Sequence, residues 1–137
     1  MLRPLLPLSL PVTALLTRAM FPNPARVQAE LEAYRTDPAR QVWVWEAQGQ
    51  PVSAAGLRTE GRHATLLHIA TAPGQERQGY GGALLRAVTG HLDLLTLSAE
   101  TDDSAADFYR RCGLTVQEVP SPWEGRRYRC EWRATPS

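Results

Sequence analysis

The sequence predicts a mixed α/β fold, with helices packed on the faces of one β-sheet. Segments with strand-like alternation and segments with helical spacing follow one another along the chain, which favours this layered arrangement. The 137 residues, 43% hydrophobic and 21% charged, suit a single domain over residues 1–137. No repeat, low-complexity tract or linker divides the chain.

The first part of the chain is expected to form an edge strand, two helices and a hairpin. Proline is tolerated in an edge strand, and Asn23 followed by Pro24 is typical of an N-cap and a first helical position. A turn at residues 48–50 joins the two hairpin strands. The expected elements are a strand at 2–6, helices at 13–20 and 24–35, and strands at 41–46 and 52–58.

The rest of the chain continues the alternation of strands and helices. A strand, a helix and a second parallel strand follow one another, and Gly113 is placed to end the next helix. We expect a central strand at 63–71, a helix from 79 or 80 to 91, a parallel strand at 94–99, a helix at 104–112 and a final hairpin at 115–119 and 126–132.

Composition and the N-terminal segment limit the choice of partners. The net charge of +1, without a basic run, gives no reason to expect nucleic acid as a partner. Arg3 precedes an apolar stretch, as in a secretory signal, but prolines interrupt it and no clear cleavage site follows. No stretch is long enough to span a membrane, so we expect a cytoplasmic protein. Cys112 and Cys130 lack metal-ligand spacing and are expected to be reduced packing residues.

A glycine-rich turn at residues 72–82 opens directly into a predicted helix. The first N–H groups of a helix have no intrahelical partner, so phosphate oxygens can accept several hydrogen bonds there. Gly79, Gly81 and Gly82 allow close approach of a ligand, and Arg77 adds a positive charge. The same glycines also fit a plain turn before a tightly packed helix.

Two common phosphate-binding motifs do not match this turn. A P-loop needs Gly-Lys-Ser/Thr, and this chain has no lysine. The dinucleotide fingerprint, aligned on Gly79 and Gly81, needs a third glycine three residues after the second, where this chain has Leu84. The turn therefore belongs to neither a Walker NTPase nor a typical Rossmann domain.

A second motif, at residues 102–114, gives the chain a resemblance to a known family. Ala105, Phe108, Tyr109 and Gly113 match the Asn-x-x-Ala-x-x-Phe-Tyr-x-x-x-Gly-Phe segment of the GCN5-related N-acetyltransferases (GNAT). Within the glycine turn, Ala72-Pro73 and Arg77-Gln78-Gly79-Tyr80-Gly81 fall where that family has its Pro-containing approach and its pyrophosphate loop, Gln/Arg-x-x-Gly-x-Gly/Ala. The resemblance covers about residues 41 to 132. It implies the GNAT-like acyl-CoA N-acyltransferase fold, in which two parallel strands of a mostly antiparallel sheet splay apart and helices cover both faces.

Three positions depart from the family pattern. Glu76 stands where the family has Gln or Arg, unless the frame shifts so that Gln78, Gly81 and Ala83 fill the loop positions. Asp102 replaces the usual Asn and Leu114 replaces Phe. Asp102 can still cap a helix, although its charge lies near an expected anionic cofactor.

The resemblance implies acetyl transfer from acetyl-coenzyme A to a primary amine, without a metal. The backbone of Ile69 and Thr71 would pair with the pantetheine arm as a strand does, and the N–H of Ile69 or its neighbour would bind the oxyanion. The implied cofactor-binding residues are Ile69, Ala70, Thr71, Arg77, Gln78, Gly79, Tyr80, Gly81, Gly82, Asp102, Ser104 and Tyr109.

Tyr109 and Glu100 are the catalytic candidates. Tyr109 occupies the position of the family's tyrosine and would protonate the departing thiolate, although it could instead only pack beside the cofactor. Glu100, at the end of the second splayed strand, would be the base; His68, in an apolar strand, is the alternative, and the family often needs no dedicated base.

The acceptor remains open at this stage. A small-molecule or peptide amine and a protein lysine are both compatible with the motifs, as are a non-catalytic coenzyme A sensor and a domain without a cofactor. Trp43 and Trp45 could line an acceptor pocket, build the core or form a homodimer face, and Trp123 could cover the acceptor or cap a subunit contact.

Overall fold

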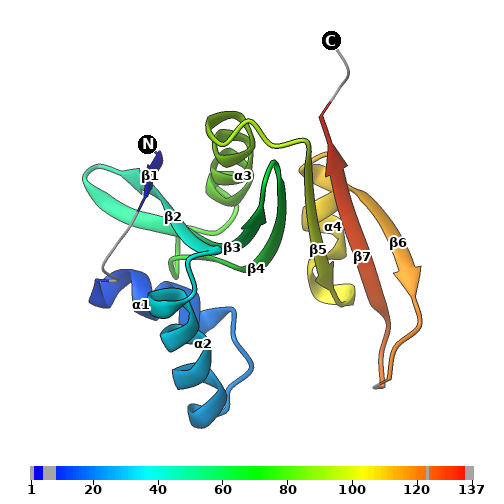
Figure 1. The fold of residues 1–137 in the computed structure, drawn as a ribbon, viewed down its shortest axis with the longest axis horizontal. Coiled ribbons are helices and arrows are strands. Elements are labelled where there is room, and N and C mark those ends of the chain that lie inside the picture. The colour runs from blue at the N-terminus through cyan, green and yellow to red at the C-terminus, as the bar shows by residue number, and fades with distance from the viewer. Residues whose placement is uncertain (1, 5–8, 123, 135–137) are drawn as a thin grey trace.

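Seven strands form one mixed sheet in the computed structural model, which describes residues 2–4, 9–122 and 124–134 (Figure 1). The strand order across the sheet is β1-β2-β3-β4-β5-β7-β6. Neighbouring strands are antiparallel except β4 and β5, so the expected mostly antiparallel sheet is confirmed. The strands are β1 (Leu2–Pro4), β2 (Arg40–Ala47), β3 (Gln50–Glu60), β4 (His63–Thr71), β5 (Thr96–Thr101), β6 (Thr115–Val119) and β7 (Arg127–Arg133).

The described residues also form four helices, and local capping explains where they begin. Asn23 caps the second helix, because its side chain accepts a hydrogen bond from the N–H of Arg26 at 3.1 Å. The first helix begins earlier than expected, since Ser9 caps it and Pro11 fits within its first turn. The helices are α1 (Leu10–Arg18), α2 (Pro24–Thr36), α3 (Tyr80–His91) and α4 (Asp103–Arg111).

The strand expected at residues 94–99 lies two residues further along the chain, as β5. Leu94 belongs instead to the turn that ends α3, where its N–H donates to the carbonyl oxygen of Thr89 at 3.0 Å. Asp93, with a φ of 51°, reverses the chain at this point. Leu94 therefore contributes to a helix end, whereas the N–H of Leu95 donates to the carbonyl oxygen of Arg62 at 2.7 Å just before the strand starts.

The parallel strands β4 and β5 pair over only three positions and then diverge (Figure 1). Residues His63 to Thr65 of β4 are in register with Thr96 to Ser98 of β5. Beyond this point β4 pairs only with β3, and β5 pairs only with β7. The expected splayed strand pair is therefore confirmed, and its open end lies at the carboxyl ends of both strands.

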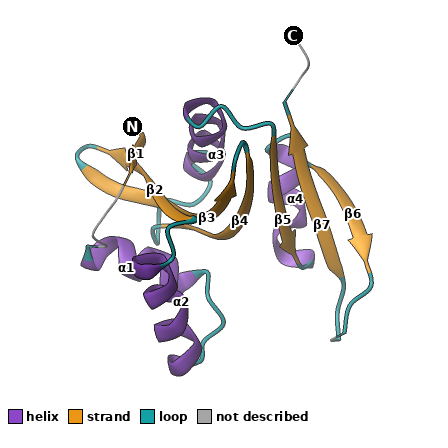
Figure 2. Cartoon of the chain, in the orientation of Figure 1, coloured by secondary structure: helices purple, strands orange, loops and turns teal. Residues whose placement is uncertain are grey.

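Helices cover both faces of the sheet, as expected (Figure 2). Side chains alternate along β2, so that Trp43 packs into the core beneath α3 and α4, while Val42 and Val44 pack beneath α1 and α2. Leu84 and Val88 of α3 are fully buried in the first of these cores. Within the described part of the chain, no helix is both long and apolar enough to cross a membrane.

Candidate active site

The glycine turn ends at the start of α3 in a conformation that leaves backbone donors available. Gly79 is the N-cap and has a φ of 80°, which favours glycine, and no side chain caps this helix. The first backbone hydrogen bond of the helix runs from Ala83 to the carbonyl oxygen of Gly79. The N–H groups of Tyr80, Gly81 and Gly82 therefore have no acceptor within the helix and can donate to an anion.

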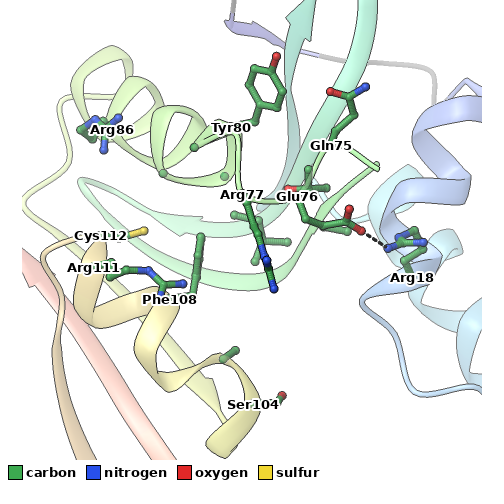
Figure 3. Close-up of a pocket in the computed structure, with 17 residues that line it drawn as sticks. Arg18, Gln75, Glu76, Arg77, Tyr80, Arg86, Ser104, Phe108, Arg111 and Cys112 are labelled. Atoms are coloured by element: carbon green, nitrogen blue, oxygen red, sulfur yellow. Dashed lines mark hydrogen bonds and ion pairs between the residues drawn. The ribbon is translucent and has the colours of Figure 1, made fainter. Parts of the chain in front are cut away.

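A cleft of about 930 Å³ lies beside this helix start, between α3, α4 and the end of β4 (Figure 3). Most residues that were predicted to bind the cofactor line it: Ile69, Ala70, Thr71, Arg77, Gly79, Tyr80, Gly81, Gly82 and Ser104. Three others, Gln78, Asp102 and Tyr109, are not among the lining residues. Asp102 is instead the N-cap of α4.

Other lining residues were not predicted as site residues. On α4, Ala105, Phe108 and Cys112 follow one another at spacings of three and four, so they share one face of the helix. That spacing in the sequence could have identified this face once Ser104 was placed in the site. The additional lining residues are Arg18, Gln75, Glu76, Arg86, Ala105, Phe108, Arg111 and Cys112.

Glu76 has a local role within the glycine turn. One carboxylate oxygen accepts a hydrogen bond from the N–H of Gly74 at 2.8 Å, and the other contacts the guanidinium of Arg18 at 3.2 Å (Figure 3). Arg18 thus offsets part of the negative charge that this residue places beside an anion site. Arg77, the next residue, has a left-handed φ of 71°.

Gly81 provides space for an aromatic side chain on the neighbouring helix. A Cβ atom at this position would lie 3.1 Å from the ring of Phe108. The absence of a side chain therefore lets α3 and α4 approach closely beside the cleft. A side chain at Gly81 would press on this ring, so glycine suits the close packing at this position.

The end of β4 offers a second set of backbone hydrogen-bonding groups. The N–H of Ala72 donates to the carbonyl oxygen of Val52 in β3. Because N–H directions alternate along a strand, those of Ile69 and Thr71 point away from β3, toward the side where β5 has diverged. No strand within the described residues pairs with β4 there, so both residues can pair with an extended ligand.

Tyr109 lies on α4 with its side chain only 5% exposed. Its ring meets that of Phe108 edge to face, with centroids 5.1 Å apart, and Phe108 in turn lines the cleft. Burial raises the pKa of Tyr109 above its usual value of 10. The phenol therefore keeps its proton at neutral pH, as an acid must.

Glu100 lies near the open end of the splayed strands. Its neighbours Leu97 and Ala99 are buried toward α3 and α4, so by alternation Glu100 projects from the opposite face of β5. Its side chain is 70% exposed and lies 4.0 Å from the guanidinium of Arg127. A carboxylate in this position is accessible to an incoming amine.

His68 belongs to a polar cluster between α2 and β4. Its Nδ1 lies 2.6 Å from the hydroxyl of Tyr34, and its Nε2 lies 3.9 Å from the carboxylate of Glu30. The tautomer with a proton on Nε2 suits both contacts, because Nδ1 then accepts from Tyr34 and the N–H faces a carboxylate. In that tautomer the lone pair of His68 is already engaged, which argues against His68 as a base.

The tryptophans and cysteines named in the sequence analysis lie in different surroundings. Trp43 is buried in the core beneath α3, and Trp45 packs partly against the same core, whereas Trp123 lies outside the described residues. Cys112 and Cys130 are free thiols. In the part of the chain that the structure describes, no group of three His, Cys, Asp or Glu residues is arranged to hold a metal ion.

A splayed parallel strand pair, with an uncapped helix start in the same cleft, defines the acyl-CoA N-acyltransferase class of fold. The family model described as "Acetyltransferase (GNAT) domain" matches residues 38–115, more than half of the chain. The chain belongs to the GNAT acetyltransferase family, as the sequence motifs indicated.

Solved structures with the same fold act on different acceptors. The chain is similar to a Bacillus subtilis acetyltransferase in complex with CoA (15% identity, 98% of each chain covered, TM-score 0.74). It is similar to the ribosomal-protein-S18-alanine N-acetyltransferase from Escherichia coli (24% identity, 96% of this chain and 90% of that chain, TM-score 0.69). It is also similar to an aminoglycoside 6'-N-acetyltransferase complexed with coenzyme A (13% identity, 100% and 98%, TM-score 0.77).

Proposed function

We propose that this protein transfers the acetyl group of acetyl-coenzyme A to a primary amine of a small molecule or peptide. The observation that carries the proposal is the meeting, in one cleft, of the uncapped start of α3 and the unpaired edge of β4. The first can bind a pyrophosphate, and the second can bind an extended amide-containing arm. Coenzyme A contains both groups, joined in one molecule.

The residues at the splayed strands would divide the chemistry among them. The neutral amine attacks the thioester carbonyl carbon, and the N–H of Ile69 donates to the oxygen that becomes negative. Glu100 accepts the proton that the amine loses, directly or through water. Tyr109 donates its proton to the departing sulfur, so that free thiol and the acetylated amine are formed.

The acceptor class is supported by the exposure of Glu100 and by the acceptors of two proteins with a similar fold. A carboxylate that is 70% exposed is reachable by a small amine or by a flexible peptide end. Among proteins with a similar fold, one is named as a ribosomal-protein-S18-alanine N-acetyltransferase and another as an aminoglycoside 6'-N-acetyltransferase. A primary amine is the chemistry that these two acceptors share.

Calorimetric titration with acetyl-coenzyme A, followed by a thiol-release assay against a panel of amines, tests the proposal. We expect binding, and free thiol with at least one amine. Gly81→Trp should abolish binding because its side chain would displace Phe108. Gly90→Trp is the matched control: Gly90 lies on the same helix, is exposed, and has no heavy atom within 4 Å of the added Cβ.

Two results would contradict the proposal in different ways. Binding without thiol release from any amine would favour a coenzyme A sensor over an enzyme. No binding to the wild-type protein would remove the cofactor assignment altogether.

Glu100→Gln should lower turnover and leave the affinity for acetyl-coenzyme A unchanged. Turnover equal to that of the wild-type protein would rule out Glu100 as the base.

A further inference from the structure

Two arginines at one end of the cleft are not explained by the pyrophosphate site. Arg86 lies on α3 and Arg111 is the last residue of α4, and both line the cleft. Arg86 is six residues beyond Tyr80, which places it about 9 Å along the helix axis from the start of α3. The helix dipole acts within the first turn, so a phosphate bound there would lie apart from Arg86.

Arg86 and Arg111 gather around Cys112 (Figure 3). A Cβ added to Gly82 would lie 3.3 Å from Nη1 of Arg86 and 3.6 Å from Sγ of Cys112, so guanidinium and thiol lie close together. Both guanidiniums act to lower the pKa of the Cys112 thiol, although burial raises it overall. The two positive charges therefore occupy the same neighbourhood.

Neither arginine has a carboxylate partner within the described part of the chain. The carboxylate that lines the cleft, that of Glu76, is paired with Arg18, and Asp107 of α4 is paired with Arg110. Two positive charges that line one cleft without a carboxylate partner among the described residues make that end of the cleft electropositive. Such a pair is suited to binding an anion with more than one negative charge.

We propose that Arg86 and Arg111 form a second phosphate subsite, which binds the 3′-phosphate of coenzyme A. This inference rests on the proposed function, because it concerns the same ligand. Coenzyme A carries a pyrophosphate and, on the adenosine ribose, a separate phosphomonoester. The start of α3 and Arg77 would bind the former, and the pair Arg86 and Arg111 would bind the latter. The protein then distinguishes coenzyme A from 3′-dephospho-coenzyme A.

Calorimetry with both ligands tests the subsite. We expect the wild-type protein to bind coenzyme A more tightly than 3′-dephospho-coenzyme A, by on the order of 10- to 100-fold, since charge-assisted hydrogen bonds are lost. The double variant Arg86→Ala/Arg111→Ala should lose this preference. Its affinity for 3′-dephospho-coenzyme A should equal that of the wild-type protein.

Arg110→Ala is the matched control. Arg110 precedes Arg111 on the same helix but pairs with Asp107 and does not line the cleft, so both affinities should stay unchanged. Equal wild-type affinities for the two ligands would overturn the subsite while leaving the proposed function intact. A double variant that weakens both ligands equally would also overturn it. Binding of neither ligand would overturn the proposed function, and the subsite with it.

Discussion

The contact between Tyr34 and His68 is possible because Gly56, which has no side chain, leaves room for the tyrosine. A Cβ at Gly56 of β3 would lie 1.9 Å from the hydroxyl of Tyr34, so only glycine leaves room for this tyrosine over the sheet. The tyrosine is 2% exposed and holds α2 to β4 through His68. Arg40 completes the cluster, with its Nη1 2.7 Å from Glu30 and its guanidinium above the ring of Tyr34.

His68 should make folding stability depend on pH. Burial lowers the pKa of His68 below its ordinary value of 6.5, although Glu30 opposes this shift. The unfolded chain therefore takes up a proton that the folded chain resists, so stability is full above about pH 6.5 and falls as pH drops below it. His68→Gln should flatten this decline in the free energy of unfolding, measured by urea denaturation at pH 7.5 and 5.5.

The control for this measurement is His63→Gln. His63 is exposed, and its ring contacts the hydroxyl of Thr96 at 2.7 Å rather than the cluster around His68. Its replacement should therefore leave the decline in the free energy of unfolding at low pH in place. If the His68→Gln variant lost as much stability as the wild-type protein between the two pH values, titration of His68 would not be the cause.

Tyr109→Phe should lower turnover by roughly 100-fold or more, while leaving the affinity for acetyl-coenzyme A unchanged, because only the proton donor is removed. Since burial raises the pKa of this phenol above 10, no loss of rate below pH 10 should come from its deprotonation. Steady-state thiol release across this pH range is the measurement.

Tyr128→Phe is the comparison for the tyrosine variant. Like Tyr109, Tyr128 is buried in the core and is not among the residues that line the cleft, but its hydroxyl is engaged as a donor to Asp103. Its loss should affect stability and spare turnover. A Tyr109→Phe enzyme as fast as the wild-type protein would leave Tyr109 with a packing role.

At the level of elements, helix α4 depends on the residue that departs from the family pattern. Asp102 accepts hydrogen bonds from the backbone N–H of Ser104 at 2.9 Å and from its hydroxyl at 2.5 Å. The hydrogen bond from the Ser104 hydroxyl is the main reason that the pKa of Asp102 is lowered. The aspartate is thus ionised and serves as the cap that was expected of it.

Asp102→Ala should lower the free energy of unfolding by about 1 kcal/mol, the usual cost of losing an N-cap. Asp102→Asn should keep most of the stability, because the amide oxygen can accept the same backbone hydrogen bond. Urea denaturation at neutral pH compares the three proteins. An alanine variant as stable as the wild-type protein would show that the cap contributes little.

Elements with a strong local signal were predictable, and those fixed by contacts distant in sequence were not. Asn23, Pro24 and Gly113 mark helix ends through capping and a left-handed turn, and the structure has these ends within a residue or two. The start of β5 was misplaced because an apolar pair such as Leu94 and Leu95 is equally compatible with a helix end and with a strand. The glycine turn at the start of α3 was placed beside a cleft from sequence alone, whereas Arg86 and Arg111 were not expected to line it, since they come to the same cleft only when α3 and α4 pack together.

At the scale of the whole molecule, the divergence of β4 from β5 leaves backbone groups on each side without a strand partner. The half of the sheet formed by β1 to β4 and the half formed by β5 to β7 are joined by three residue pairs between the parallel strands. Ligands of open α/β sheets bind at the carboxyl ends of strands, and this opening lies at such an end.

Amide hydrogen exchange should report the pairing of a ligand with β4. On addition of acetyl-coenzyme A, the N–H groups of Ile69 and Thr71 should exchange roughly tenfold more slowly, because they acquire acceptors. Ala70, whose N–H points toward β3, is the internal control and should change little. NMR exchange rates with unchanged values at Ile69 and Thr71 would rule out strand-like binding of the arm.

Because the ladder between β4 and β5 is limited to three residue pairs, we expect it to act as a hinge between the two halves of the sheet. Past them the two halves of the sheet share no ladder of hydrogen bonds, so bending there breaks none. A ligand lying along the open edge would fill the angle between the halves and oppose its closing or widening. We therefore expect the loaded protein to be stiffer than the protein that has just released its product, with the difference concentrated at this hinge rather than in either half.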